Sequence, residues 1–281
     1  MPDKAPVEIN SFGLTHIGKV REDNQDAFRL CKPDDEFTNS HGHLYGIADG
    51  MGGYAHGGIA SSNALETFFD TFYSANDAAV IQKIRVGMQN ANLSVYQAAQ
   101  KMSAGKMGTT LTTVNIIGKN LFIGHIGDSR AYLIRNNESK CLTNDHTQVG
   151  ELVRMKILPP NKIRSHSQRS VLNKSLGLNL FIQPDIFRTS VQNDDVLILC
   201  TDGIWSVIED HEFAKYVTVT KNPERLSSMI IDIALDRESD DNLSIVVIEL
   251  KKLDDSSFTQ EKKPSFSFSN LIKKIGRTND K

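Results

Sequence analysis

Three short apolar segments follow one another closely near the middle of the chain, and they constrain the fold most. They are TTLTTVNII (109–117), NLFIGHIG (120–127) and RAYLIRN (130–136), all rich in β-branched or aromatic residues. Turn residues separate the three segments, which is typical of consecutive strands. Strands joined so closely pair antiparallel, because a parallel crossover needs a dozen or more residues. The centre of the chain is therefore predicted to form an antiparallel sheet.

Two helices are predicted before this region and two after it. The early pair covers about 57–73 and 78–102, and the late pair covers about 210–216 and 223–235. In the second helix, apolar side chains recur at helical spacing. Further expected elements are strands at 7–15, 43–49, 194–203 and 242–250 and a short helix at 147–155. Strands clustered at the centre, with two long helices adjacent in sequence, predict an α+β fold rather than alternating βαβ units.

One domain is expected over residues 1–250, followed by a polar tail over 251–281. The chain has 281 residues, of which 39% are hydrophobic, and that suits a folded domain with a sizeable core. Beyond Leu250, the stretch 254–269 is polar and Ser-rich, as in a disordered linker. The stretch 268–275 places a few apolar residues at helical spacing, so a short amphipathic helix that docks on a partner or a membrane surface is the alternative.

Composition excludes several classes of protein. The formal net charge is −2, so no basic face for nucleic acid is implied. Cys31, Cys141 and Cys200 are an odd number without metal-like spacing, which indicates free thiols in a reducing compartment. Neither a signal peptide nor a transmembrane stretch is expected from the pattern, so a cytoplasmic location is predicted.

Aspartates stand beside the ends of five strand-forming segments. Asp49 and Asp202 each precede a glycine, in IADG and CTDG, and Asp128 ends FIGHIGD. Asp26 follows the first strand in REDNQDAF, and Asp241 precedes the last strand in ESDDN. A single Asp-Gly is an ordinary turn. Five such carboxylates at one end of a compact layer would repel one another, and a bound cation is the natural way to neutralise them.

The donor set indicates which cation. Carboxylate and carbonyl oxygens suit Mg²⁺ or Mn²⁺, whereas the histidines form no zinc-binding pattern. Gly50 and Gly203 allow the main chain to approach such a site closely. With two oxygen-bound divalent ions, the expected chemistry is hydrolysis of a phosphate ester.

Eight ordered motifs carry a resemblance to a known family. They are VREDNQDAF, GIADGMGG, GTTL, GHIGDSRAYLI, LTNDHTQV, SLG, LILCTDGIW and SDDNLSIVVI, spread between Ser11 and Leu250. In this order and spacing they resemble the metal-dependent protein serine/threonine phosphatases, the PPM or type 2C family, in the form typical of bacteria. The resemblance implies an αββα sandwich, in which two antiparallel sheets are flanked by helices and a metal cleft lies at one edge.

The resemblance also implies roles for individual residues. Asp49 would bridge two core metal ions, Asp202 and Asp241 would complete the first site, and Asp26 with the Gly50 carbonyl would serve the second. Asp128 with Asp202 matches a weaker third site, and Arg21 matches the phosphate-binding arginine. Arg21, Asp49 and Asp202 are thus the expected catalytic residues. A hydroxide shared by the two ions would attack phosphorus directly, without a phospho-enzyme.

Several positions keep a structural alternative. Arg21 could instead pair with a local carboxylate, and His125 is interpreted as a satisfied core or cleft-edge histidine. Ser129, Arg130 and the pair Asp145-His146 are interpreted as structural. Tyr54 stands where many bacterial relatives have His, so a general-acid role at 54 or at His56 does not carry over. Residues 158–169, hereafter the flap segment, match the family's flap beside the active site.

The expected partners follow from the resemblance. They are phosphoserine and phosphothreonine proteins, in particular a cognate serine/threonine kinase and its substrates, and the chain is expected to be a monomer. A non-catalytic scaffold with the same fold is the alternative function. A two-metal nuclease is disfavoured because the composition implies no basic groove.

Overall fold

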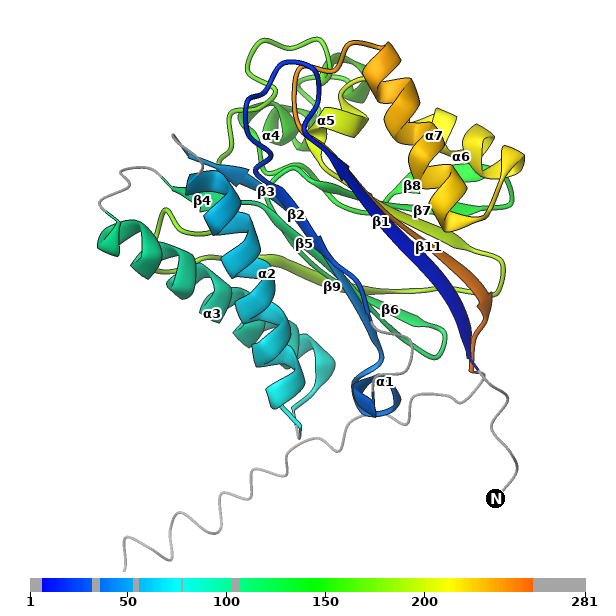
Figure 1. Ribbon diagram of the computed structural model, residues 1–281, viewed down its shortest axis with the longest axis horizontal. Helices are drawn as coiled ribbons and strands as arrows, with labels where there is room; N and C mark the ends of the chain where they lie inside the picture. The colour runs from blue at the N-terminus through cyan, green and yellow to red at the C-terminus, as the bar shows by residue number, and fades with distance from the viewer. Residues whose placement is uncertain (1–6, 32–35, 53–55, 77, 103–106, 255–281) are drawn as a thin grey trace, which may run out of the picture.

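Two antiparallel sheets stack face to face, and helices cover the outer face of each (Figure 1). The structure, a computed structural model, describes residues 7–31, 36–52, 56–76, 78–102 and 107–254. The predicted fold, an αββα sandwich, is confirmed.

The first sheet has the strand order β1-β11-β10-β7-β8. Its strands are β1 (Glu8–His16), β11 (Leu243–Lys252), β10 (Val196–Cys200), β7 (Arg130–Arg135) and β8 (Glu138–Cys141). The outer face of this sheet packs against α6 (Asp210–Val219) and α7 (Pro223–Asp236). Both helices begin at capped ends: Glu209 and Glu212 form a capping box before α6, and the Asn222 side chain accepts from the Arg225 amide at the start of α7.

The second sheet has the strand order β2-β3-β5-β6-β9, with β4 added beside β3. Its strands are β2 (Asp26–Arg29), β3 (His43–Met51), β4 (Gly108–Thr109), β5 (Leu111–Ile117), β6 (Asn120–Ile126) and β9 (Asp185–Ser190). The helices α2 (His56–Ser74) and α3 (Val80–Lys101) cover its outer face, on the left of Figure 1. The apolar stripe predicted for the second helix is buried against this sheet.

Alternating side chains of the two sheets fill the space between them. Ile47, Val114, Leu197, Leu199 and Val246 are all buried in this central layer. Because β10 is third of five strands and lies under helices on its outer face, its whole run Val196–Cys200 is buried, as the continuous apolar run predicts. The three cysteines are free, and Cys200 is buried in the core as expected.

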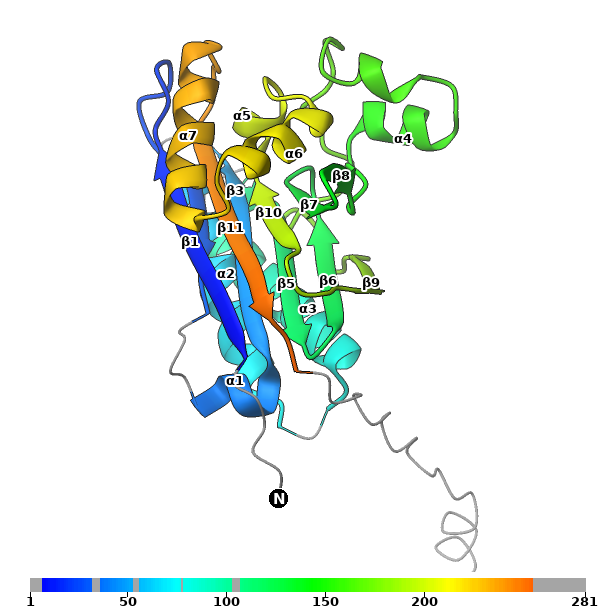
Figure 2. The same ribbon diagram turned by 90° about the vertical axis from the view of Figure 1, so that its right-hand side faces the viewer.

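The remaining elements lie mostly at one end of the sandwich. They are α4 (Gln148–Arg154), η1 (Pro160–Lys162) and α5 (Asp202–Trp205), while α1 (Glu36–His41) lies at the other end. Figure 2 shows α4 and α5 at the top of the molecule, above the ends of β10 and β7. None of the described helices is long and apolar enough to span a membrane.

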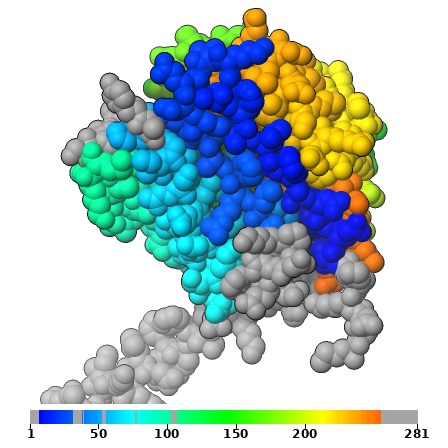
Figure 3. All heavy atoms as spheres, in the orientation of Figure 1, coloured from blue at the N-terminus to red at the C-terminus, as the bar shows by residue number. Residues whose placement is uncertain are grey.

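Antiparallel order brings the predicted acidic residues to this same end. β3 and β10 finish there, β3 two residues after Asp49 and β10 two residues before Asp202. β2 and β11 begin there, at Asp26 and two residues after Asp241. The connection between β1 and β2, residues 17–25, also reaches this end, and Lys19 Nζ donates to the carbonyl of Leu235 in α7 at 2.7 Å. Figure 3 shows this blue segment beside the orange helix.

Candidate active site

A cavity of about 680 Å³ opens at the end of the sandwich where these strands meet. Four of the five predicted aspartates line it, together with two other predicted site residues: Asp49, Asp128, Asp202, Asp241, Arg21 and Gly50. The fifth aspartate, Asp26, lies directly beside them, since it pairs with Asp49 across β2 and β3. The Thr201 hydroxyl donates to Asp26 Oδ2 at 2.8 Å. Because Thr201 directly precedes Asp202, this hydrogen bond holds the Asp26 carboxylate close to the turn that carries Asp202.

The carboxylates perturb one another. Burial, reinforced by the charges of Asp202 and Asp241, raises the pKa of Asp26 to about 7. Burial, reinforced by the charge of Asp241, raises the pKa of Asp202 to about 6, although a hydrogen bond with Asp49 acts in the opposite direction. For Asp49 and Asp128, burial and the surrounding carboxylates raise the pKa well above its usual range. A cavity of this kind favours a bound cation, because a cation offsets both the cost of burying the carboxylates and the repulsion between them.

The donor set fits a hard divalent cation. Asp202 Oδ1 is buried without a hydrogen-bond partner among the described residues, so it is free to accept a cation. The five aspartates offer only carboxylate oxygens as donor atoms, and oxygen is the ligand type that Mg²⁺ and Mn²⁺ prefer. Within the described ranges no three His, Cys, Asp or Glu side chains cluster as closely as the ligands of one ion. The carboxylates line the cavity wall instead, and water is the usual source of the remaining ligands for such ions.

Glycine is required directly after two of the aspartates. A Cβ at Gly50 would lie 2.0 Å from the carbonyl oxygen of Gly57, and a Cβ at Gly203 would lie 2.0 Å from that of Asn242. The close approach allows α2 and the turn before β11 to pack directly on the chain beside Asp49 and Asp202. The two Asp-Gly pairs are therefore turns that also bring carboxylates to the cavity.

Arg21 reaches the cavity from the 17–25 connection. Its Nη2 pairs with Asp241 Oδ2 at 2.7 Å, and its Nε donates to the carbonyl of Asp240 at 3.3 Å. The side chain is 53% exposed. The ion pair with a local carboxylate, one of the two alternatives left by the sequence, is thus formed, and Arg21 also lines the cavity.

Asp241, rather than Asp240, faces the cavity. Asp241 lines it, whereas the Asp240 side chain is 70% exposed and lies 3.8 Å from Arg169. The flap segment lies next to this edge, and the residues that follow it, Ser170 and Leu172, line the cavity.

Three polar residues that fix the site were missed by reasoning from the sequence. Thr110 Oγ1 accepts from the Asp49 amide at 2.9 Å, and Thr109 Oγ1 donates to the Asp49 carbonyl at 2.8 Å. The Asn242 amide group donates to the carbonyls of Ile17 and Asp23, and its oxygen accepts from the Gln25 amide. The motifs GTTL and SDDN contained these residues, but a sequence gives no partner for their side chains.

Three of the residues interpreted as structural have polar partners within the fold. His125 lies fully buried between Thr112 and the carbonyl of Asn144, and burial lowers its pKa to about 4. Ser129 Oγ lies 2.7 Å from Thr110 Oγ1, and Arg130 pairs with Asp145 at 2.7 Å. The burial and contacts of His125, Ser129 and Arg130 agree with the structural interpretation. Tyr54 lies outside the described residues, and His56 is half-buried at the start of α2.

Comparison with known proteins identifies the class that this fold and cavity define. The family model "Protein phosphatase 2C" matches residues 10–172 and 179–243. The chain therefore belongs to the protein phosphatase 2C family, an enzyme family of metal-dependent phosphoprotein phosphatases, and the predictions of family and enzyme class are confirmed.

Individual relatives agree with this assignment. Protein phosphatase PhpP of Streptococcus pneumoniae is 29% identical over 246 residues, which cover 86% of this chain and 97% of PhpP. The crystal structure of the PPM Ser-Thr phosphatase MsPP from Mycobacterium smegmatis, in complex with cacodylate, is similar with a TM-score of 0.75 and 32% identity, covering 88% of this chain and 100% of MsPP. The catalytic domain of the serine threonine protein phosphatase PstP, in complex with two manganese ions, has the same fold, with a TM-score of 0.75, 24% identity and coverage of 87% and 99%.

Proposed function

We propose that this protein removes phosphate from phosphoserine and phosphothreonine side chains of other proteins, using two core Mn²⁺ or Mg²⁺ ions and a weaker third. The observation that carries the proposal is the meeting of five aspartates from separate strand ends around one cavity. The raised pKa values of Asp26, Asp49, Asp128 and Asp202 indicate a site that requires added positive charge. The two manganese ions in the related PstP structure support the same chemistry.

The proposed ligand roles are distributed over the cavity. Asp49, between Asp26 and Asp202, is the residue shared by the two core ions. Asp202 and Asp241 complete one site, and Asp26 with the Gly50 carbonyl serves the other. Asp128 and Asp202 are the residues for the third ion; the charge of Asp202 adds to burial in raising the pKa of Asp128. When bound, the ions supply an activated water for direct attack on phosphorus and charge to stabilise the transition state.

The chain's own residues orient the substrate and hold the ligands. The guanidinium of Arg21 forms a planar fork suited to two phosphoryl oxygens. Its pairing with Asp241 keeps it at the cavity edge, so it is already placed when a phosphoryl group enters. Thr109 and Thr110 hold the main chain of Asp49 from both sides, which fixes the carboxylate before the reaction.

The proposed partners are phosphoproteins, among them a serine/threonine kinase and the substrates that the phosphatase would return to their unphosphorylated state. The bacterial phosphatases among the relatives support this context. We propose a monomeric, cytoplasmic enzyme with a catalytic domain over residues 1–250. Residues 255–281 of the tail lie outside the described residues, and the proposed role of the tail is docking on a protein partner.

A non-catalytic scaffold is the alternative from another class. Loss of catalysis in such a protein would require a broken ligand set, whereas all five aspartates and Arg21 are present around the cavity. The intact set therefore favours an enzyme.

Hydrolysis of a phosphothreonine peptide tests the proposal. The purified protein is expected to release phosphate with Mn²⁺ and to stop when EDTA is added. Asp49→Asn and Asp202→Asn are expected to lose nearly all turnover, because each removes a shared or buried ligand. Asp70→Asn is the matched control, since the Asp70 side chain is 67% exposed and pairs only loosely with Arg29 at 3.7 Å. Activity that survives EDTA, or that persists in both site variants, would show that the proposal is wrong.

A further inference from the structure

The carbonyl of Asp128 is anchored by a buried indole. Trp205 Nε1 donates to the Asp128 carbonyl at 2.9 Å, across 77 residues of chain. Trp205 is only 1% exposed and ends α5, the short helix that begins at Asp202. One side chain thus connects the two turns that carry Asp128 and Asp202.

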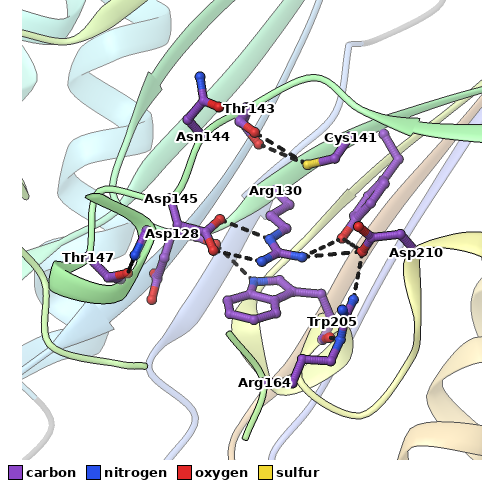
Figure 4. A network of polar contacts seen from close by, with 12 residues as sticks. Asp128, Arg130, Cys141, Thr143, Asn144, Asp145, Thr147, Arg164, Trp205 and Asp210 are labelled. Carbon is purple, nitrogen blue, oxygen red and sulfur yellow. Dashed lines mark hydrogen bonds and ion pairs between the residues drawn. The ribbon is translucent and has the colours of Figure 1, made fainter. Parts of the chain in front are cut away.

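Arg130 holds the indole from the other side. Its guanidinium carbon lies 3.7 Å from the centroid of the Trp205 ring. Two parallel hydrogen bonds, of 2.9 and 2.7 Å, join the guanidinium to Asp145. Figure 4 shows this stack, with Arg130 between Asp145 and Asp210 and with Trp205 against its face. The side chains of Arg130 and Asp145 are 5% and 4% exposed, so the pair is rigidly held.

Arg164 brings the flap segment into the same cluster. Its Nε donates to the carbonyl of Trp205 at 2.8 Å, and its Nη2 donates to the carbonyl of Ile208 at 3.0 Å. The same Nη2 pairs with Asp210 Oδ1 at 2.6 Å, and Asp210 Oδ1 in turn accepts from the hydroxyl of Tyr132 at 2.8 Å. Arg164 is only 13% exposed, although it comes from a surface segment.

These contacts lead from the flap segment to the cavity. Arg164 binds both ends of the turn from Trp205 to Asp210, and Trp205 binds Asp128. Shortly after Arg164, the chain returns to the cavity wall at Ser170 and Leu172. The position of Arg164 therefore fixes the flap segment relative to the carboxylates of Asp128 and Asp202.

We propose that Arg164 is a positioning residue that, through Trp205, sets the geometry of the weak divalent-ion site at Asp128. This inference rests on the proposed function, because it assumes that Asp128 binds an ion. Arg164 acts through Trp205 and touches neither the substrate nor the ion. A lysine cannot replace it, because one ammonium group cannot reach two carbonyls and a carboxylate in the planar arrangement of a guanidinium.

The test measures Mn²⁺ binding directly, by isothermal titration, in the full-length protein. Arg164→Ala and Arg164→Lys are expected to weaken the weakest Mn²⁺ site about tenfold, the scale of one lost charge-assisted hydrogen bond, and to leave the tighter sites unchanged. Trp205→Phe removes the N–H donor and keeps a smaller aromatic ring, and it is expected to weaken the same site. Combined with Arg164→Ala it should add little, because the two residues act in series. Arg154→Ala is the matched control, since Arg154 lies in neighbouring α4, is 50% exposed and pairs with Glu151.

A purely structural role of Arg164 predicts a different result from a role in positioning the ion site. In that case Arg164→Ala would lower the melting temperature and leave all Mn²⁺ affinities at their wild-type values, which overturns the inference. Retention of the weak site in Arg164→Lys would also overturn it, because charge alone would then suffice. Steady-state kinetics at saturating Mn²⁺ should show a raised KM for a phosphothreonine peptide in Arg164→Ala. If the wild-type protein binds Mn²⁺ but hydrolyses no phosphopeptide, the proposed function fails, whereas the Mn²⁺ titrations still decide the role of Arg164.

Discussion

Without divalent ions, the protein should lose stability as the pH rises from about 4 to about 7. The pKa of Asp26 rises from 3.8 to about 7 on folding, and that of Asp202 to about 6. Across this interval the folded state binds more protons than the unfolded chain, so the free energy of unfolding falls with increasing pH. The stabilisation is complete below the unfolded pKa and is lost once the pH passes the folded pKa.

The size of the effect follows from the shift. At about 1.4 kcal/mol per pKa unit, the change at Asp26 corresponds to about 4 kcal/mol between the two ends of the interval. Since Asp26 and Asp202 repel each other, their contributions are coupled and are not summed. Asp26→Asn removes the titration but retains an oxygen that can accept from Thr201. In EDTA, the free energy of unfolding of the wild-type protein should therefore fall by about 4 kcal/mol more than that of Asp26→Asn between pH 4 and pH 8.

Urea denaturation at several pH values in EDTA, and again with Mg²⁺, provides the assay. The wild-type protein should regain stability with Mg²⁺ mainly at the alkaline end, because ions bind deprotonated carboxylates. Asp70→Asn is the control for a general carboxylate effect, since Asp70 is well exposed. Parallel stability curves for Asp26→Asn and wild type in EDTA would refute the reasoning.

Three further perturbations test separate parts of the structure. Gly50→Ala should abolish most phosphatase activity, because its Cβ would meet the Gly57 carbonyl at 2.0 Å; Gly58→Ala, with no neighbour nearer than 3.5 Å, should retain it, and equal activities would contradict the packing argument. Asp145→Asn should cost about 3 kcal/mol in chemical denaturation, because it leaves Arg130 buried with an incomplete partner. Asp194→Asn, at an 82% exposed site, should cost almost nothing, and a similar cost for both would refute the importance of burial. Removal of residues 255–281 should leave hydrolysis of p-nitrophenyl phosphate unchanged and slow action on the protein partner, whereas an equal fall on both substrates would argue against a docking role.

The sequence predicted the elements whose signals are local and long. The stripe in α3 and the continuous apolar run of β10 are both strong periodic patterns, and both elements formed where expected. Shorter elements were missed: β2 and α5 have four residues each, too few to show a period. β8 and β9 were also missed, because their exposed positions break the apolar pattern.

The acidic cavity was also predictable, because the positions of its aspartates beside strand ends are a local signal in the sequence. Each aspartate lies beside a strand end, and antiparallel pairing places alternate ends together. The register that sets Asp26 opposite Asp49, however, depends on contacts between distant segments.

Side-chain partners were beyond reach of the sequence. Trp205 meets Asp128 across 77 residues, and Arg164 meets Trp205 across 41. Arg21 could be expected to bind either a carboxylate or a phosphate, and only the fold reveals its pairing with Asp241. Such contacts depend on the packing of whole layers, which no local pattern encodes.

The most direct test of the central claim, that the aspartates at these strand ends form a divalent-ion centre, is a calorimetric titration of the purified protein with Mn²⁺ at neutral pH. The wild-type protein is expected to bind at least two ions with release of protons, because Asp26 and Asp202 are partly protonated before binding. Asp49→Asn should lose both core ions, since Asp49 is the ligand that we propose for both of them. Tight binding of two ions by Asp49→Asn, or no binding by the wild-type protein, would contradict the account.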